Sequence, residues 1–350
     1  MTVGTDRSEV APSGPEPKAS LLDRFRSDGR WARWGIWLAI IAVIAVLVGT
    51  WGLARKALVF GLAEEAPLAL AAVGFALIYR LTGLINVAYA ETVTLGAYFG
   101  MWFNTTFGWN FYVSLLPAAL SAGVLSVATY FAFFRPAKRR DVGVVEMIIL
   151  SFGLSMFLRY GLQLIFGHEQ RYFKVAFQKP IMVLGLGVPP FRVTALAGVI
   201  AAALLLYWFI QKTRLGVQIR ALAGDEKLAQ VSGINPLATT VLIWFIAGLA
   251  GGAAGAFYGV GATARPMLGW GKFLWILLAV LVGGSKGLRG VIIAGLGMGI
   301  LISGLTQFFG LGFIPEHFRG QGLYAEIVVL LFFMILLKVR GNRMSETGKV

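Results

Sequence analysis

The chain has no cysteine, and among its 350 residues it has only two histidines and 13% charged residues. Without cysteine it can form no disulfide, no thiolate nucleophile and no cysteine-ligated metal site. His168 and His317 are isolated from each other, so they predict neither a metal site nor a serine protease triad. These absences argue against an enzyme, and we expect no catalytic residue, no bound metal and no cofactor.

Apolar residues dominate instead. The chain is 58% hydrophobic with a mean hydropathy of +0.77, whereas soluble domains are roughly 45–50% apolar. Crossing about 30 Å of hydrocarbon takes roughly 20 helical residues, and lipid admits only helices or closed barrels. The pattern predicts an all-α polytopic membrane protein of about ten transmembrane helices, with one or more broken or re-entrant segments such as the short run 272–284. We place the spans at 34–50, 57–79, 84–103, 111–134, 143–166, 192–210, 237–260, 272–284, 289–309 and 322–338.

The charge distribution predicts the domain organisation and the topology. Residues 1–33 are polar and rich in Pro, Ser and Gly, which indicates a disordered cytoplasmic tail. Residues 34–340 form the transmembrane domain, and 341–350 form a second cytoplasmic tail. With the amino terminus inside and ten alternating spans, 21 Lys and Arg residues fall inside and nine outside, as the positive-inside rule requires. The net charge of +15 therefore indicates contact with membrane lipid, and we expect no nucleic-acid partner.

One polar insert, residues 212–237, separates two long apolar runs. Its stretch from Ile219 to Val231 favours a helix, and the following Gly233 and Pro236 are typical of a helix end. We expect a short helix on the cytoplasmic membrane surface that a soluble partner binds. The alternative is an ordinary amphipathic connector.

Ionisable residues inside spans are functional candidates, because they cost several kcal/mol unless they are paired or hydrated. Glu91 is the foremost, since four further polar residues accompany it in a Gly-flanked apolar run: Asn86, Tyr89, Thr92 and Thr94. Such a segment can be broken, with freed backbone groups lining a substrate path. A polar network that only packs helices together is the alternative. For Glu64, Glu65 and Arg159, ion pairing or placement at the membrane interface is the expected explanation.

Three sequence blocks follow one another along the chain: Gly83–Tyr98, Arg220–Asn235 and Leu281–Gly290. Together they resemble the permease family for branched-chain (hydrophobic) amino acids in the ABC transporter superfamily, and the resemblance covers roughly residues 57–340. The sequence departs from the usual family pattern at Val87, Tyr89 and Ala90, where Phe, His and Gly are common, and at Lys286 and Arg289. The first group bears on the choice of substrate.

The resemblance implies a transmembrane permease subunit of an ABC importer in a bacterial inner or plasma membrane, with both termini cytoplasmic. The implied partners are two cytoplasmic ABC ATPase subunits, a second permease subunit of the same or a paralogous kind, and an extracytoplasmic substrate-binding protein. The implied cargo is branched-chain amino acids, with other amino acids, urea and short amides left open. The insert would couple to the ATPase through Arg220, Gly224, Asp225, Glu226, Lys227, Ala229 and Gly233.

The chain has no nucleotide-binding motif of its own, because Gly283–Gly290 lacks the Gly-Lys-Ser/Thr ending that holds phosphate and metal. The energy for transport must therefore come from another subunit or from an ion gradient. The main alternative is accordingly an ion-coupled secondary transporter that uses Glu91 as its coupling carboxylate. A structural or regulatory membrane subunit is a third hypothesis.

Overall fold

A computed structural model describes residues 51–175, 179–284, 287–309, 327–332 and 334–335. The expected tails at 1–33 and 341–350 and the first expected span, 34–50, lie outside these residues, as does part of the last span, 322–338. The described part is helical apart from connecting segments and one two-stranded hairpin. Helices satisfy their backbone hydrogen bonds internally, which is why so apolar a chain takes this form in lipid.

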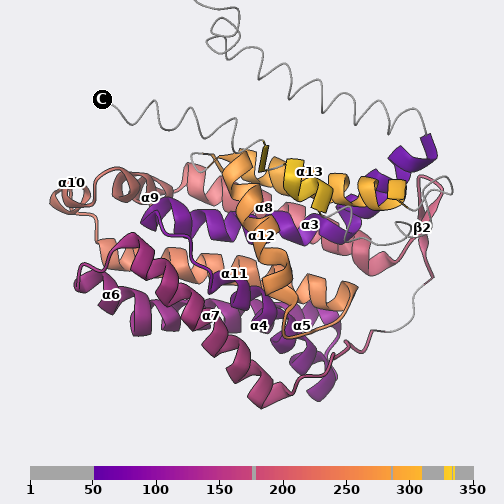
Figure 1. Cartoon of the computed structure of the whole chain (residues 1–350), viewed down its shortest axis with the longest axis horizontal. Helices are drawn as coiled ribbons and strands as arrows, with labels where there is room; N and C mark the ends of the chain where they lie inside the picture. Colours follow the sequence, from indigo (N-terminus) through magenta and orange to yellow (C-terminus); the bar gives the residue numbers. More distant parts are fainter. Residues whose placement is uncertain (1–50, 176–178, 285–286, 310–326, 333, 336–350) are drawn as a thin grey trace, which may run out of the picture. The chain divides into compact units, whose positions relative to one another are not determined.

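The elements follow one another with short connections. Strands β1 (Ile181–Val183) and β2 (Leu186–Val188) form an antiparallel hairpin between α7 and α8. In Figure 1 this hairpin lies at one end of the helices, and α6, α9 and α10 lie at the other. The helices are α3 (Trp51–Thr82), α4 (Tyr89–Thr106), α5 (Phe111–Thr129) continuing through the π-helical turn Tyr130–Phe134 into α6 (Arg135–Arg139), α7 (Val144–Phe166), α8 (Pro190–Lys212), α9 (Arg214–Gly224), α10 (Glu226–Val231), α11 (Pro236–Gly261), α12 (Leu268–Gly283) and α13 (Leu288–Phe309).

Six stretches of helix in the described residues are long and apolar enough to cross a membrane: α3, α5 with α6, α7, α8, α11 and α13. The chain is therefore a multi-pass helical membrane protein, but the expected ten spans are not confirmed. Two of the ten expected spans, 84–103 and 272–284, are not among these six. In the structure α4 begins only at Tyr89, and α12 has 16 residues, a length of about 24 Å at 1.5 Å per residue.

The chain is interrupted between α3 and α4. Gly83 has φ +67° and residues 83–86 form no helix, yet Leu84 and Asn86 are buried. The main-chain N–H of Val87 donates to Ser151 Oγ of α7 at 3.0 Å. A neighbouring helix thus satisfies part of the backbone that the interruption frees, which is the condition for irregular backbone inside a membrane protein.

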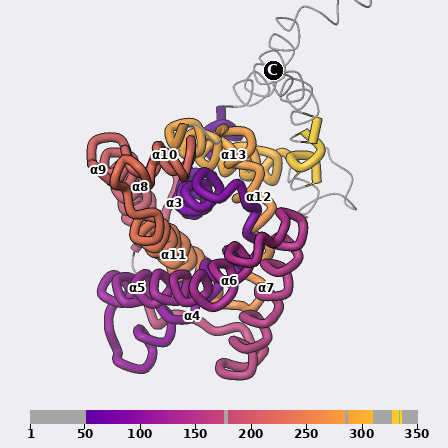
Figure 2. Tube along the Cα trace, turned by 90° about the vertical axis from the view of Figure 1, so that its left-hand side faces the viewer, coloured from indigo at the N-terminus to yellow at the C-terminus, as the bar shows by residue number. Residues whose placement is uncertain are grey.

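Helix α3 has the largest buried share of the six spans. It contacts α8, α11, α12 and α13, and Figure 2 shows its tube among them. Small residues make these contacts close. A Cβ added to Gly61 of α3 would lie 2.6 Å from Ile300 Cα of α13, and one added to Gly255 of α11 would overlap the carbonyl oxygen of Val93 in α4. Close backbone approach of this kind holds helices together where lipid removes the hydrophobic driving force.

Candidate functional site

A buried ion pair joins α4 to α7. Glu91 Oε1 accepts hydrogen bonds from Arg159 Nη2 at 2.6 Å, from Arg159 Nε at 3.1 Å and from Ser155 Oγ at 2.9 Å. The two charged side chains are 1% and 9% exposed, and the guanidinium also lies 4.7 Å from the ring centre of Trp270 in α12. Charges at this depth are tolerable because each has an opposite charge and hydrogen bonds.

The spacing of polar residues in α7 positions this pair. Ser151, Ser155 and Arg159 recur every fourth residue, so they share one face of the helix. That face is buried against α4, while the remaining surface of α7 is largely apolar and exposed. The pairing of Arg159 with Glu91 was not predicted from the sequence. The four-residue repeat of polar side chains in an apolar helix was the signal that pointed to a shared partner.

The other residues expected on a substrate path are buried beside Glu91. The Tyr89 hydroxyl donates to backbone carbonyls of α3 and α11 at 2.9 and 3.2 Å, and Thr92 Oγ1 donates to the Tyr89 carbonyl at 2.6 Å. Thr94 Oγ1 accepts from a main-chain N–H of α12 at 3.0 Å. Asn86 Oδ1 is buried without a hydrogen-bond partner among the described residues. The structure brings these groups together at the start of α4, and their role on a substrate path stays a prediction.

The insert forms two short helices, so the single helix expected over Ile219 to Val231 is wrong. Asp225 has extended backbone angles of φ −149° and ψ 112°, and its Oδ1 accepts the Leu228 N–H at 3.0 Å. An aspartate in this position caps a new helix, which is why α9 ends at Gly224 and α10 begins. The expected stop is confirmed, because Gly233 has φ +82° and its N–H donates to the Gln230 carbonyl at 2.9 Å.

The residues expected to contact an ATPase differ in their surroundings. Gly224, Asp225, Lys227 and Gly233 are exposed. Arg220 is exposed too, but its Nη1 donates to the Ile210 carbonyl at 3.0 Å and so ties α9 to the end of α8. Ala229 is buried. Glu226 is half-buried and pairs with Lys138 of α6.

Two apolar residues of the insert that the sequence analysis overlooked are strongly exposed. Leu228 is 66% and Val231 is 87% exposed, both on α10. Apolar residues at this spacing in a helix usually lie on its buried face. Here α10 lies at the end of the helix bundle, and no other described helix covers Leu228 or Val231. They stand beside the charged start of α10.

A cleft separates α10 from α6. Its volume is about 500 Å³, and Lys138 and Glu226, whose Nζ and Oε2 atoms are 2.7 Å apart, both line it. Three of its lining residues are basic and one is acidic, so the cleft carries a net positive charge. The basic residues of α6 are distant in sequence from the insert, and the structure joins them to α10 in one surface. The lining residues are Tyr130, Arg135, Lys138, Arg139, Glu226, Gln230, Pro236, Leu237 and Thr240.

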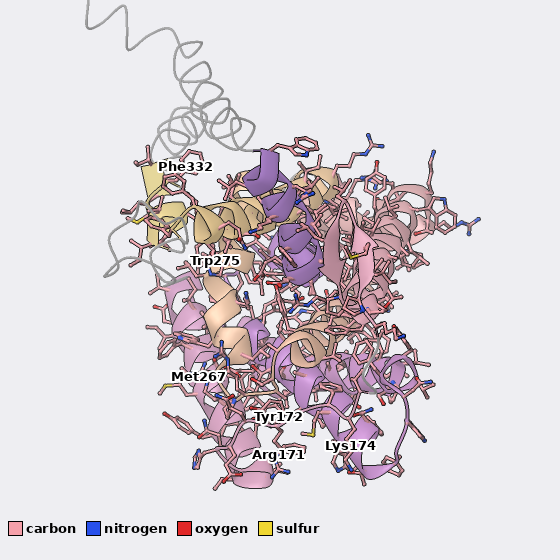
Figure 3. The ribbon with its side chains drawn as sticks, turned by 90° about the vertical axis from the view of Figure 1, so that its right-hand side faces the viewer. Arg171, Tyr172, Lys174, Met267, Trp275 and Phe332 are labelled. Atoms are coloured by element: carbon pink, nitrogen blue, oxygen red, sulfur yellow. The ribbon has the colours of Figure 1, made fainter. Side chains whose placement is uncertain are left out.

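The opposite end of the helices has its own structure. The segment after α7 is fixed by a bridge between Arg171 and Ala264 and by Asn104 Oδ1, which accepts the Lys174 N–H at 2.6 Å. Arg171, Tyr172 and Lys174 lie together on this end in Figure 3, and their side chains are exposed. The exposed end therefore presents cations beside an aromatic ring.

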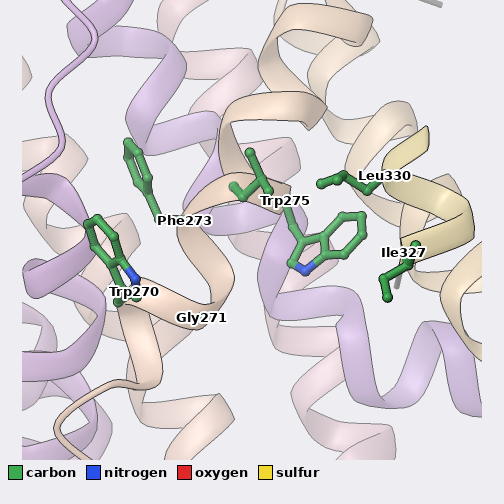
Figure 4. Close-up of a pocket in the computed structure, with 7 residues that line it drawn as sticks. Trp270, Gly271, Phe273, Trp275, Ile327 and Leu330 are labelled. Carbon is green, nitrogen blue, oxygen red and sulfur yellow. The ribbon is translucent and has the colours of Figure 1, made fainter. Parts of the chain in front are cut away.

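An apolar pocket of about 450 Å³ lies between α12 and the helical residues 327–332. Figure 4 shows the Trp275 ring beside Ile327 and Leu330, with Trp270 and Phe273 on the other side. No charged side chain lines it in the described residues, so it suits an apolar chain rather than a polar solute. Within the same residues, no group of three His, Asp or Glu side chains could hold a metal ion.

Comparison with known proteins identifies the family. The model of the family described as branched-chain amino acid transport system, permease component, matches residues 57–339. The high-affinity branched-chain amino acid transport system permease protein LivH of Escherichia coli K12 is 26% identical over 298 residues, covering 78% of this chain and 91% of LivH. The nucleoside ABC transporter permease protein NupC of Lactococcus lactis is 26% identical over 272 residues, covering 72% and 84% of the two chains. The ribose import permease protein RbsC of Bacillus subtilis is 34% identical over 153 residues, 43% of this chain and 46% of RbsC. Since the family match spans most of the sequence, this chain belongs to the branched-chain amino acid transport system permease family.

Proposed function

We propose that this chain is the transmembrane permease subunit of an ABC importer and carries branched-chain amino acids or a related small polar solute. The family match and the similarity to LivH along most of both chains support this cargo. Relatives whose names specify nucleosides and ribose show that permeases similar to this chain serve several solutes. Uptake of leucine, uridine and ribose by the complete transporter is therefore the measurement that decides the cargo.

The observation that carries the proposal is the surface formed by α9, α10 and α6. Leu228 and Val231 are exposed on α10 although they are apolar, and exposed apolar side chains next to a groove are typical of a partner interface. A short helix that inserts into a groove of its partner is a common recognition mode. Asp225 and Lys227 precede these two apolar residues and would set the orientation of the partner, an ATPase subunit.

The arrangement of the chain suits transmission of movement from that surface. Arg220 ties α9 to the end of α8, and α11 begins five residues after α10 ends. A partner that binds α10 differently in two nucleotide states would therefore tilt α8 and α11 together. The complete importer would contain two ATPase subunits, a second permease subunit and an extracytoplasmic binding protein that docks at the hairpin end. Both termini would then be cytoplasmic.

In the same proposal the start of α4 reaches the solute path in another conformational state. Asn86, Tyr89, Glu91, Thr92 and Thr94 would become accessible when α4 and α7 separate and the Glu91 to Arg159 contact opens. The interrupted backbone at 83–86 supplies a place for such a movement.

An ion-coupled transporter that uses Glu91 is less well supported. A coupling carboxylate must exchange its proton or ion with water, whereas Glu91 is enclosed and held by Arg159. ATP depletion with a clamped ion gradient distinguishes the two mechanisms. The importer stops under this condition, while an ion-coupled carrier continues.

Site-specific crosslinking tests the proposed ATPase surface. Lys227→Cys places a thiol on the exposed start of α10, and Tyr172→Cys places one on the opposite end as the matched control. We expect the first variant to crosslink to a peripheral ATPase subunit in membranes and the second to give no such product. Crosslinking from Tyr172→Cys, or none from Lys227→Cys across several linker lengths, contradicts the assignment of this surface.

A further inference from the structure

Two consecutive carboxylates of α3 pair with cations from different helices. Glu64 pairs with Arg192 at the start of α8. Glu65 Oε1 accepts from Lys272 Nζ of α12 at 2.7 Å, and Glu65 Oε2 accepts from the Tyr258 hydroxyl of α11 at 2.9 Å. Lys272 Nζ also lies 4.9 Å from the centre of the Tyr258 ring. Three helices thus meet at the single carboxylate of Glu65.

The Glu65 to Lys272 pair is intermediate in exposure between the other ion pairs. Its side chains are 16% and 23% exposed, whereas those of Glu91 and Arg159 are 1% and 9% exposed. A pair as enclosed as the latter cannot exchange partners with a solute while the helices stay packed. A pair on the surface exchanges easily but attracts weakly, because water screens it. The Glu65 pair is partly exposed and otherwise enclosed by three helices, so water screens it less than a pair on the surface, and both properties favour selective binding of an ionic ligand.

We propose that Glu65, Lys272 and Tyr258 form a binding site for the zwitterionic head group of an α-amino acid on the transport path. The inference rests on the proposed function, since it requires that the chain transports a small solute. The ammonium group of the ligand would take the place of Lys272 on Glu65, and the carboxylate of the ligand would accept from Lys272. One ion pair becomes two, and no charge is left unpaired.

The chemistry of the site discriminates between classes of solute. A zwitterion supplies both charges that the separated pair needs, and the Tyr258 ring adds a cation–π contact for the ammonium group. A ribose or a nucleoside supplies neither charge, so it would have to separate the pair without replacing it. Sites built from buried polar groups reject ligands that lack the matching groups strongly, because their own groups are then left unpaired.

The neighbouring Glu64 to Arg192 pair provides a matched control. It begins one residue earlier on α3, but Glu64 is 45% exposed and the pair has no aromatic hydroxyl among its described partners. Removing its charge changes the local net charge by the same amount as removing that of Glu65. It leaves the proposed binding groups in place.

The test uses the complete transporter in proteoliposomes and the purified permease–ATPase complex without its binding protein. We expect Lys272→Met to lower the kcat/KM of ATP-driven leucine uptake by about tenfold or more, while Lys272→Arg retains most of it and Glu64→Gln matches the wild type. In ligand-observed NMR of the complex, leucine should bind better than leucinamide, which lacks the carboxylate, and Lys272→Met should abolish that preference. A purely structural role for Lys272 would weaken both ligands equally.

The possible failures are distinguishable. If the wild type takes up uridine or ribose but not leucine, the amino-acid cargo and the binding site are wrong while the importer function stands. If it takes up none of these solutes in an ATP-dependent manner, the proposed function itself is wrong. If the wild type takes up leucine and Lys272→Met leaves both uptake and the preference over leucinamide unchanged, only the binding site is wrong. Should Lys272→Met fail to reach the membrane, the neutral double variant Glu65→Gln/Lys272→Met replaces it. The same loss is expected, and unchanged leucine uptake overturns the site.

Discussion

Replacing Glu91 with glutamine leaves the guanidinium of Arg159 inside the protein without an opposite charge. The two side chains are 1% and 9% exposed and share two hydrogen bonds. Removing one partner of a buried pair costs about 3–5 kcal/mol, because the remaining charge is uncompensated. Ser155 Oγ still accepts from Arg159 and the Trp270 ring still lies beside it. These contacts compensate in part, so we expect a loss near the lower limit, about 3 kcal/mol.

A double-mutant cycle separates this effect from the loss of packing. Glu91→Gln, Arg159→Met and the double variant are compared by the free energy of unfolding in mixed micelles titrated with SDS. Each single variant should lose about 3 kcal/mol, and the double variant should lose no more than either, since it contains no unpaired charge. The matched control is Glu226→Gln, which breaks a pair with side chains 62% and 43% exposed. We expect a loss below about 1 kcal/mol for that control.

The reasoning is refuted if Glu91→Gln loses no more stability than Glu226→Gln, or if the losses of the two single variants add in the double variant. Either outcome would mean that the Glu91 to Arg159 pair is hydrated or uncoupled. Uptake by Glu91→Gln, measured per folded transporter, tests the substrate-path prediction separately. We expect a changed transport rate or substrate preference. If neither changes, Glu91 has only a helix-packing role.

Two further predictions concern glycines. Gly255→Ala should destabilise the protein by about 1–3 kcal/mol, because its Cβ would overlap the Val93 carbonyl oxygen. The control Gly153→Ala in α7 meets open space and should be neutral or stabilising by up to about 1 kcal/mol. Equal free energies of unfolding of the two variants in SDS would contradict the close packing of α4 and α11. Gly233→Val should lower solute uptake per ATP hydrolysed, because a β-branched residue resists φ +82° at a cost of about 1–2 kcal/mol and displaces the start of α11. Gly233→Asn tolerates that conformation and should retain coupling, and full coupling in Gly233→Val would show that this turn does not transmit movement.

The sequence predicted those features that depend on neighbouring residues. The expected spans at 57–79, 192–210 and 237–260 lie within α3, α8 and α11, and the expected span at 143–166 matches α7 except for its first residue. The glycine stop at Gly233 was equally readable, because a positive φ is a property of a single residue. The division of the insert at Asp225 was missed although its signal is local, because Gly is unfavourable inside a helix and Asp225 caps α10 through its own side chain.

The sequence alone determined the membrane class, the helical form, the positions of most long spans and the membership of a permease family. Hydropathy and the order of motifs can be read along the chain without knowledge of its folding. Only the tertiary structure showed which charged side chains form ion pairs. Glu91 pairs with a residue 68 positions away, and Glu65 with one 207 positions away. Pairing or placement at the membrane interface was expected for Glu65 and Arg159, but their partners could not be named from the sequence. The strength of an ion pair depends on distance and burial in three dimensions, and neither is encoded in local periodicity.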